Sequence, residues 1–191
     1  MRKRLVYVLL FLLLIATVAS ANQTELMWVR YTSKKIGVSI VVPSNWDIIE
    51  QVPFVFDESL TELTVVIVAD VDEGEKYVPN MNIVIEDLDG VEVSALEVAV
   101  SVNLLYLLYG SSYGIKDYKN LGIRELTIGE FDASQLTYEI TIPNGDQFLR
   151  GRQVYIPVGS KYYCLTFTTT TYQWDEYEPI FSEIVNSFVL E

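Results

Sequence analysis

The C-terminal half of the chain carries the pattern that most restricts its fold. Residues 134–142 alternate apolar and polar side chains, and Asn144-Gly145 follows almost at once. This dipeptide favours a type I′ turn, in which both central residues need positive φ. The chain returns through residues 148–156, turns again at Gly159-Ser160, and runs extended through residues 162–169. We therefore expect a meander of antiparallel strands.

Other extended segments precede this meander. They are predicted at residues 28–31, 38–42, 46–49, 63–69, 81–85 and 124–128. The first three are expected to form a hairpin-type opening. The run 63–69 is almost wholly apolar and β-branched, which is typical of a central strand buried on both faces.

Two helices are predicted. Ser94 begins the first, with Glu97 three residues on as a capping box, and Gly110 follows its end. Its apolar side chains recur at helical spacing: Leu96, Val100, Leu104, Leu107 and Leu108. Because this helix is so strongly apolar, we expect it to lie on a sheet. The second helix has an amphipathic stripe of Trp174, Tyr177, Phe181, Ile184 and Phe188.

The N-terminal segment predicts export. Three basic residues, an apolar run over 5–16 and the small residues Ala19-Ser20-Ala21 are typical of a cleaved signal peptide. We expect a signal peptide at residues 1–21 and a single domain at residues 22–191, secreted or extracytoplasmic in the periplasm or at the cell surface. An uncleaved segment would instead tether the domain to a membrane. Asn22 begins an Asn-Gln-Thr glycosylation pattern, and the sequence leaves its use open.

Cleavage would make the protein strongly acidic. Residues 1–21 hold three positive charges and no negative ones, so their removal takes the formal net charge from −13 to −16. Phosphates repel a protein of this charge. We therefore expect no nucleic-acid partner and no direct binding of the mature domain to anionic membranes.

The residue inventory narrows the possible chemistry. The chain has no histidine, which removes the Ser–His and Cys–His nucleophile pairs and most zinc sites. Its one cysteine, Cys164, lies in an apolar strand and is expected to be a buried small hydrophobe. No P-loop, dinucleotide-binding turn or nucleophile elbow is present. We assign no catalytic residue, no metal ligand and no cofactor, and leave the binding residues open.

Two acidic groups lie on the predicted strand pair, and the first is a candidate cation site. Residues 70–75 supply four carboxylates, but their spacing departs from that of an EF-hand loop, and a solvated turn is the simpler interpretation. Residues 86–89 are expected at the other end of the same strand pair, so the two groups should not form one site. Paired carboxylates for glycoside hydrolysis cannot be selected among the 26 acids.

Aromatic side chains are the remaining candidates for recognition. One group is expected near the C-terminal strand–helix junction and another near the N-terminus: Tyr162, Tyr163, Tyr172, Trp174 and Tyr177, and Trp28, Tyr31 and Trp46. Packing between helix and sheet is the favoured interpretation for both groups. Tyr106, Tyr109 and Tyr113 surround the exit of the first helix and are candidates for the rim of a groove.

Two stretches resemble a known family. Residues 31–46 lead an extended segment into Val-Pro-Ser-Asn-Trp at 42–46. Residues 160–188 join a Gly-Ser turn, an aromatic strand, a threonine run and a closing helix ending Ile-Val-Asn-Ser-Phe. These strings resemble the PsbP-like superfamily, which includes the lumenal extrinsic protein of photosystem II and bacterial DcrB-type proteins. The resemblance implies an α+β fold, an antiparallel sheet flanked by helices in an α/β/α sandwich.

The resemblance also implies no common enzyme activity, and many relatives assist an assembly outside the cytosol. A further relative binds a small nuclear GTPase, a role that the export signal argues against. We therefore expect an exported, non-catalytic accessory or binding domain that contacts a partner protein or an envelope assembly. The alternative is a small-molecule or divalent-cation-binding module, using a cleft between helix and sheet or the loop at residues 70–75. A carboxylate-based hydrolase ranks third.

Overall fold

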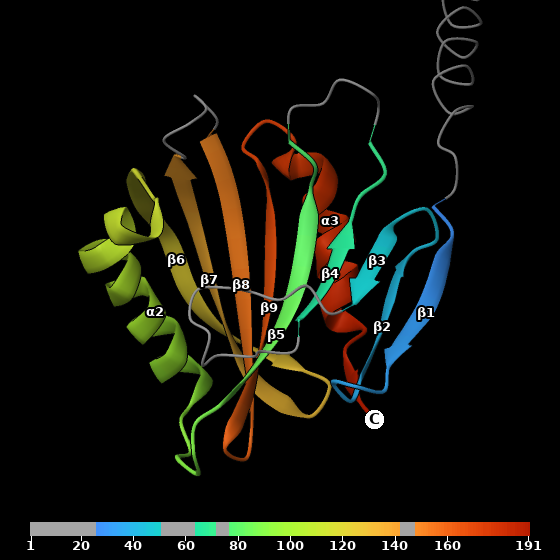
Figure 1. Ribbon diagram of the computed structural model, residues 1–191, viewed down its shortest axis with the longest axis horizontal. Helices are drawn as coiled ribbons and strands as arrows, with labels where there is room; N and C mark the ends of the chain where they lie inside the picture. Colours follow the sequence, from blue (N-terminus) through green and yellow to red (C-terminus); the bar gives the residue numbers. More distant parts are fainter. Residues whose placement is uncertain (1–25, 51–63, 72–76, 142–147) are drawn as a thin grey trace, which may run out of the picture.

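The computed structural model describes residues 26–50, 64–71, 77–141 and 148–191 (Figure 1). The expected signal peptide, the Asn144-Gly145 turn and residues 72–75 of the first acidic group lie outside these ranges.

A seven-stranded sheet forms most of the described structure. Its strands are β3 (Asp47–Glu50), β4 (Thr64–Val68), β5 (Asn80–Asp87), β6 (Asp117–Ile128), β7 (Phe131–Thr141), β8 (Phe148–Val158) and β9 (Lys161–Thr170). They lie in the order β3-β4-β5-β9-β8-β7-β6, and every pairing is antiparallel. The predicted meander is confirmed in β6 to β9. Strand β6 begins at Asp117, before the predicted start at Arg124. A bulge at Gly122 (φ 143°) interrupts the alternation of side chains that marks a strand in sequence, so only the part after the bulge was predicted.

The prediction of a central strand at residues 63–69 is wrong. Strand β4 is next to the edge of the sheet, between β3 and β5. Val65 and Ile67 are buried, whereas Val66 and Val68 on the other face are only half-buried. A β-branched run therefore marks a strand here without marking burial on both faces.

A second, smaller sheet lies beside the first. It contains β1 (Trp28–Ser33), β2 (Val38–Pro43) and β10 (Val189–Leu190), in the order β1-β2-β10. The opening hairpin is confirmed between β1 and β2, but β3 leaves it to pair with β4 in the large sheet. Val38, Ile40 and Val42 of β2 are fully buried in a core shared with the large sheet.

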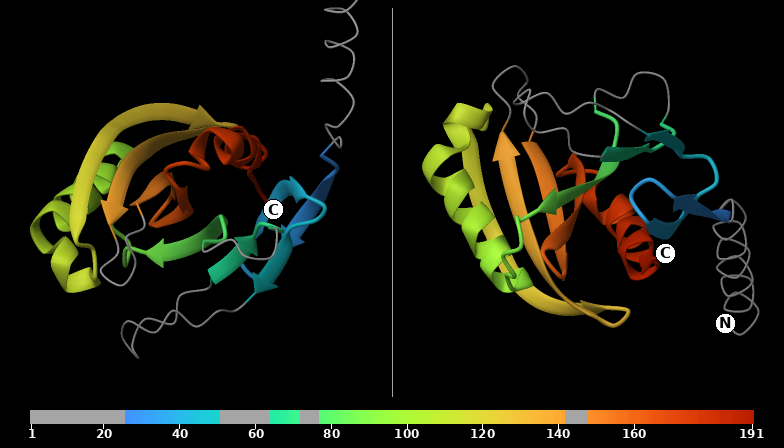
Figure 2. Two further views of the ribbon diagram at one scale, coloured as in Figure 1. Left: turned by 90° about the horizontal axis from the view of Figure 1, so that it is seen from above. Right: turned by 60° about the horizontal axis from the view of Figure 1, so that its bottom comes forward.

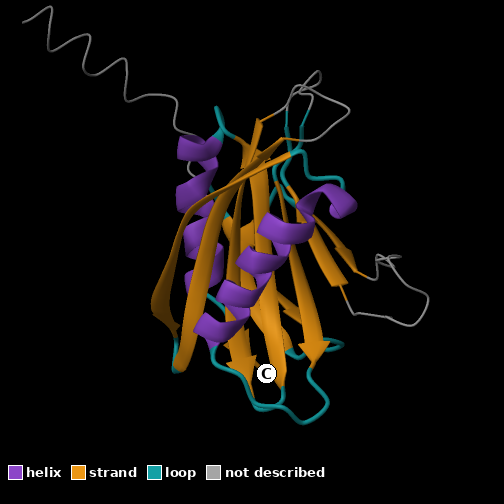
Figure 3. Ribbon diagram, turned by 90° about the vertical axis from the view of Figure 1, so that its left-hand side faces the viewer, coloured by secondary structure: helices purple, strands orange, loops and turns teal. Residues whose placement is uncertain are grey.

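The expected α/β/α sandwich is therefore wrong. Most of the described part of the chain is strand, arranged in two sheets, with only two α-helices (Figure 3). The physical reason is that the three-stranded sheet fills part of the space that a helical layer would occupy in a sandwich. The fold is β-rich: the three-stranded sheet shares one face of the large sheet with one helix, and the other helix covers only part of the opposite face.

These helices are α2 (Ala95–Tyr109), which continues into the 3₁₀ turn η1 (Gly110–Tyr113), and α3 (Trp174–Asn186). Helix α3 stacks Phe181 on Phe167 of β9, with ring centroids 4.4 Å apart. Helix α2 packs on the opposite face of the large sheet, over β6, β7 and β8, as the right-hand view of Figure 2 shows. The predicted capping box is confirmed, because the Glu97 N–H donates to Ser94 Oγ and the Ser94 N–H donates to the Glu97 carboxylate.

Candidate functional site

Helix α2 is held on the sheet by its small and polar residues. Ala99 is fully buried, and Ala95 and Val98 are buried beside it. Asn103 Oδ1 accepts hydrogen bonds from the Tyr118 hydroxyl at 2.9 Å and from the Asn120 amide at 2.8 Å. Because alanine has no side chain beyond Cβ, this face of the helix can approach the sheet closely.

The large apolar side chains of α2 face away from the sheet. Seven of them are exposed: Leu105, which lies toward the groove described below, and Leu96, Val100, Leu104, Leu107, Leu108 and Tyr109, which we call the outer face of α2. Leu108 is 69% exposed and Leu107 55%. These include every residue of the apolar stripe that the sequence suggested for this helix. The helix does lie on a sheet, but helical spacing alone could not show which side meets it, because α2 is apolar all round.

The outer face of α2 is large for an unpartnered surface. Its side chains leave on the order of 600 Å² in water, which is at the upper limit for the largest apolar patch of an ordinary monomer. Glu97 in the first turn is the only charged residue of the helix. The segment Ala95–Ser112 is long and apolar enough to cross a membrane by length and composition alone, and 22% of it is buried in the domain.

Exposed carboxylates border one end of this face. Asp89 and Glu92 precede the helix and Glu97 lies in its first turn, all three exposed. The hydrogen bond from the Ser94 backbone lowers the pKa of the Glu97 carboxyl, so it stays anionic. The outer face of α2 is therefore apolar along its length and acidic at its N-terminal end.

A groove of about 560 Å³ runs between the other flank of α2 and the sheet. Its helix wall is formed by Ser101, Val102, Leu105 and Tyr106, its opposite wall by Asn82, Val84 and Glu86 of β5, and its floor by Tyr138, Gln153, Tyr155, Tyr162, Cys164 and Thr166. The groove exists because α2 covers β6 to β8 and leaves the same face of β9 and β5 uncovered by helix.

Hydrogen bonds order the polar part of the groove floor. Gln153 Nε2 donates to the Tyr106 hydroxyl at 3.2 Å and to Thr166 Oγ1 at 3.3 Å. The Tyr155 hydroxyl donates to Gln153 Oε1 at 2.7 Å. At the end of the groove the Tyr162 hydroxyl donates to the Glu86 carboxylate. The Gln153 amide is thus fixed in one orientation at the centre of the floor.

The tyrosines of this region stay protonated. Burial raises the pKa of Tyr118 to about 12, with a further contribution from Tyr106. Burial also raises the pKa of Tyr138 and of Tyr155 well above the ordinary value. Their hydroxyls therefore remain neutral hydrogen-bonding groups over the whole physiological range of pH.

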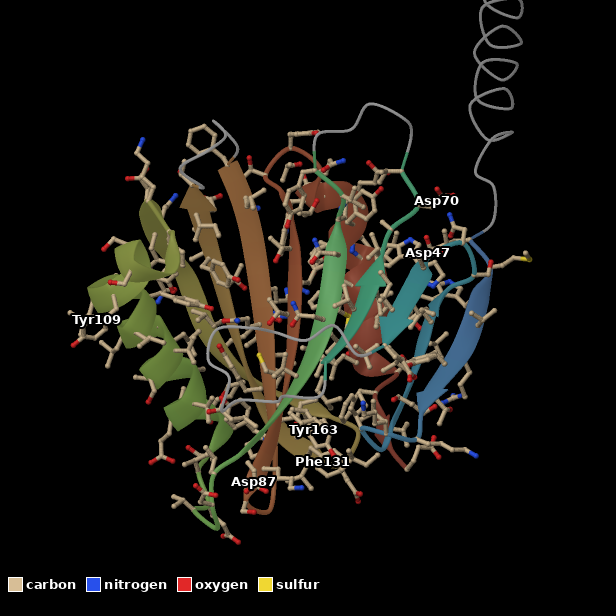
Figure 4. The ribbon with its side chains drawn as sticks, in the orientation of Figure 1. Asp47, Asp70, Asp87, Tyr109, Phe131 and Tyr163 are labelled. Carbon is tan, nitrogen blue, oxygen red and sulfur yellow. The ribbon has the colours of Figure 1, made fainter. Side chains whose placement is uncertain are left out.

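Of the three tyrosines predicted to border a groove, only one is seen to line it. Tyr106 lines the groove, as expected. Tyr109 is 56% exposed at the far end of α2 and points away from the sheet (Figure 4). The side chain of Tyr113 lies outside what the structure describes.

The aromatic residues near the C-terminus do not form one cluster. Trp174 and Tyr163 belong to the core on the α3 face, whereas Tyr162 lies on the opposite face in the groove floor. Tyr172 is exposed. In the N-terminal group, Trp46 is buried and Trp28 and Tyr31 pack partly buried against the same core. Core packing is therefore confirmed for Trp46 and Trp174.

The acidic groups are far apart. Asp70 follows β4 and Asp87 ends β5, which places them at opposite ends of this antiparallel pair, as predicted (Figure 4). Asp87 faces Lys161 at 3.7 Å. Within the described ranges, no three His, Cys, Asp or Glu side chains are grouped closely enough to hold a metal ion. Cys164 is buried, as expected.

The α3 face also carries an ion pair that the sequence did not predict, in which Arg152 is buried and Glu178 is partly exposed. The Arg152 guanidinium lies over the Trp174 ring, 5.3 Å from its centroid, and pairs with Glu178. Arg150 lies over the same ring and pairs with Glu139 at 2.7 Å. Arg150 and Arg152 are two positions apart, on one face of a predicted strand, and this spacing is the signal that could have indicated the cluster. All four charges are paired, so we assign them a structural role.

Solved structures with the same fold as this chain exist. No family model matches the sequence, and no curated protein does. Among solved structures, cyanobacterial PsbP (CyanoP) from Synechocystis sp. PCC 6803 superposes with a TM-score of 0.62 at 15% identity, covering 90% of this chain and 96% of that one. The fold is PsbP-like.

Two further PsbP-like structures agree. LpqN of Mycobacterium tuberculosis, described as involved in cell envelope biogenesis, has a TM-score of 0.52 at 12% identity, over 87% of this chain and 92% of its own. The Ran-binding protein Mog1p of Saccharomyces cerevisiae has a TM-score of 0.56 at 12% identity, over 87% and 96%. At such low identity these likenesses show the fold alone.

Proposed function

We propose that this chain is an exported, non-catalytic binding domain that docks a protein partner outside the cytosol through the outer face of α2. The single observation that carries the proposal is the orientation of α2. The helix turns alanines and an asparagine to the sheet and leaves its leucines in water. Exposing this much apolar surface is unfavourable unless another surface covers it.

The charge around the outer face of α2 favours a protein with a basic border as the occupant. Asp89, Glu92 and Glu97 would meet lysines or arginines across the contact. A bilayer with anionic lipids would repel the acidic chain, and two copies of it would repel each other. A partner protein with an apolar face and a basic border satisfies both features.

The location is proposed from the sequence. The basic and apolar segment at residues 1–21 has the pattern expected of a secretory signal, and residues 22–191 would be the exported domain. The likeness to LpqN, described as involved in cell envelope biogenesis, supports an envelope role. The likeness to Mog1p supports protein binding on this fold, while its partner Ran is not carried over.

The non-catalytic character is also a proposal. The chain has no histidine to act as a base near neutral pH. The one carboxylate that lines the groove, Glu86, accepts a hydrogen bond from Tyr162, and the tyrosines around it have raised pKa values. This set of groups is suited to binding rather than to proton transfer.

The test is affinity capture of the full chain, tagged at its C-terminus and expressed in its native cells. The variant Leu104→Asp/Leu108→Asp places two charges on the outer face of α2. The matched control, Ile49→Asp/Val189→Asp, changes two side chains that are about half exposed elsewhere. We expect one envelope protein to be retained by the wild type and the control, and to bind at least tenfold more weakly to the α2 variant.

Two further measurements separate the occupants. Flotation with zwitterionic vesicles and sedimentation equilibrium are run on the same three proteins. Vesicle binding that is lost only in the α2 variant would show that a lipid surface, and not a protein partner, covers the outer face of α2. Self-association that is lost only in the α2 variant would show that a second copy covers it. Capture that is equal for the α2 variant and the wild type would overturn the proposal.

A further inference from the structure

We propose that the groove between α2 and β5 is a binding site for a small uncharged amphiphile, an apolar molecule that carries a hydroxyl or amide group. This site lies on the opposite flank of α2 from the outer face, and it does not depend on the proposed function.

The groove has the size and composition of a ligand site. Its volume of about 560 Å³ falls within the range of roughly 300–1,000 Å³ that is usual for small-molecule pockets. Val84, Val102 and Leu105 supply apolar contact from two facing walls. Such walls bind the apolar body of a ligand by removing its surface from water.

Hydrogen-bonding groups face one another across the same groove. The Asn82 amide lies on the β5 wall and the Ser101 hydroxyl on the α2 wall. Neither side chain makes a hydrogen bond within the described part of the protein. Between them the Gln153 amide is locked by Tyr106, Thr166 and Tyr155. A preorganised amide next to two further polar groups suits a hydroxyl or amide on the ligand.

The charge of the groove selects against anions. Glu86 is its one charged side chain among the described residues, and no lysine or arginine lines it. A carboxylate or phosphate would enter without a counter-charge and beside a fixed negative one, which is costly at a partly buried site. This excludes an anionic ligand, and the hydroxyl and amide groups that make up most of the polar lining match an uncharged polar group.

Cys164 makes the site measurable without mutation, because this largely buried residue lines the groove floor and its small exposed part is reached through the groove. It is the only cysteine of the chain, and its side chain lies in the groove floor. A ligand in the groove will cover the thiol. The rate at which a thiol-specific reagent labels Cys164 therefore reports occupancy.

The experiment compares three probes on the full chain. Octyl glucoside below its micelle concentration has an apolar chain and an uncharged hydroxylated head, glucose lacks the chain, and octanoate has an anionic head. We expect octyl glucoside to slow Cys164 labelling at least fivefold in a saturable manner, with little effect of glucose or octanoate. The melting temperature, measured with the same probes, should rise only with octyl glucoside.

Two variants tie the effect to the groove. Ser101→Trp fills it from an exposed helix position, so the fold is preserved and both responses should be lost. Ser112→Trp makes the same change at an exposed position of η1 outside the groove, and both responses should remain. Octyl glucoside bound only to the outer face of α2 would stabilise Ser101→Trp as well. Three results would overturn the site. They are stabilisation of Ser101→Trp by octyl glucoside, equal effects of octanoate and octyl glucoside, and no change in the labelling rate or melting temperature of the wild type.

Discussion

Asn103 of α2 accepts a hydrogen bond on its Oδ1 atom from the hydroxyl of Tyr118 on β6, over 2.9 Å. This contact and the buried Ala99 settle how α2 is rotated on the sheet. In a helix that is apolar on every side, the polar and small positions are those that specify orientation. The exposed leucines follow from that choice.

Replacing Asn103 by leucine should destabilise the domain by about 1–3 kcal/mol, because the half-buried hydroxyl of Tyr118 and the Asn120 amide lose their acceptor. Urea unfolding measures the change. Asn186→Leu, at the exposed end of α3, is the control and should stay near the wild type. Equal midpoints for all three proteins would show that Asn103 does not anchor the helix.

The two sides of α2 should respond oppositely to changes in size. Ala99→Leu inserts three carbons at a fully buried position and should cost about 1–3 kcal/mol. Leu104→Ala removes three carbons at a half-exposed position and should change stability by less than about 0.5 kcal/mol. Thermal unfolding of the two variants measures both. The reverse order would mean that the leucines face the sheet.

Gly151 should tolerate no side chain. It pairs with Tyr138 across β7 and β8, and a Cβ at this position would overlap the buried tyrosine ring. Gly151→Ala should therefore lower the free energy of unfolding by about 1–3 kcal/mol or more. In Gly110→Ala the new Cβ meets Ile115 at 3.5 Å, an ordinary contact, and stability should be kept. Equal losses in the two variants would contradict this close approach.

Acid should weaken the arginine cluster on the α3 face. Burial is the largest single effect on Glu178 and would raise its pKa, but the hydrogen bond and charge of Arg152, with the hydrogen bond from Ser182, together outweigh it, and the pKa is lowered. The hydrogen bond from Arg150 likewise lowers the pKa of Glu139. A carboxyl whose pKa is lower in the folded state stabilises that state above its unfolded pKa, and this contribution disappears as pH falls through the folded pKa.

The wild type should therefore lose stability between about pH 5 and about pH 2, where carboxyls of this kind become protonated. Glu178→Gln should show a smaller loss, while Glu183→Gln, an exposed change on the same helix, should follow the wild type. Urea midpoints over this range test the point. If the stability of Glu178→Gln depends on pH as that of the wild type does, the ion pair between Arg152 and Glu178 does not cause the loss of stability in acid.

Local signals predicted much of the fold. The alternation in residues 134–142 predicted strand β7, because side chains of a strand point alternately to two faces, and the extended run after the Gly159-Ser160 turn predicted β9. The capping box at Ser94 and the stripe from Trp174 to Phe181 predicted the starts of both helices. Each of these signals lies within a few residues of the element it marks.

Features that depend on distant contacts were not predictable in this way. Pairing of β2 with β10 joins residues 38–39 to 189–190, and this second sheet is what replaced the expected helical layer. The close approach of Gly151 to Tyr138 and the groove beside Gln153 likewise arise from strands brought together only in the fold.

The most direct measurement of the central claim is site-specific photocrosslinking in the native cell envelope. A photoreactive side chain is placed at position 104 on the outer face of α2, or at position 176, an exposed site on α3. The account predicts a single discrete adduct with another protein from position 104 and none with that protein from position 176. Adducts from position 104 only with lipid or with a second copy, or the same adduct from both positions, would contradict it.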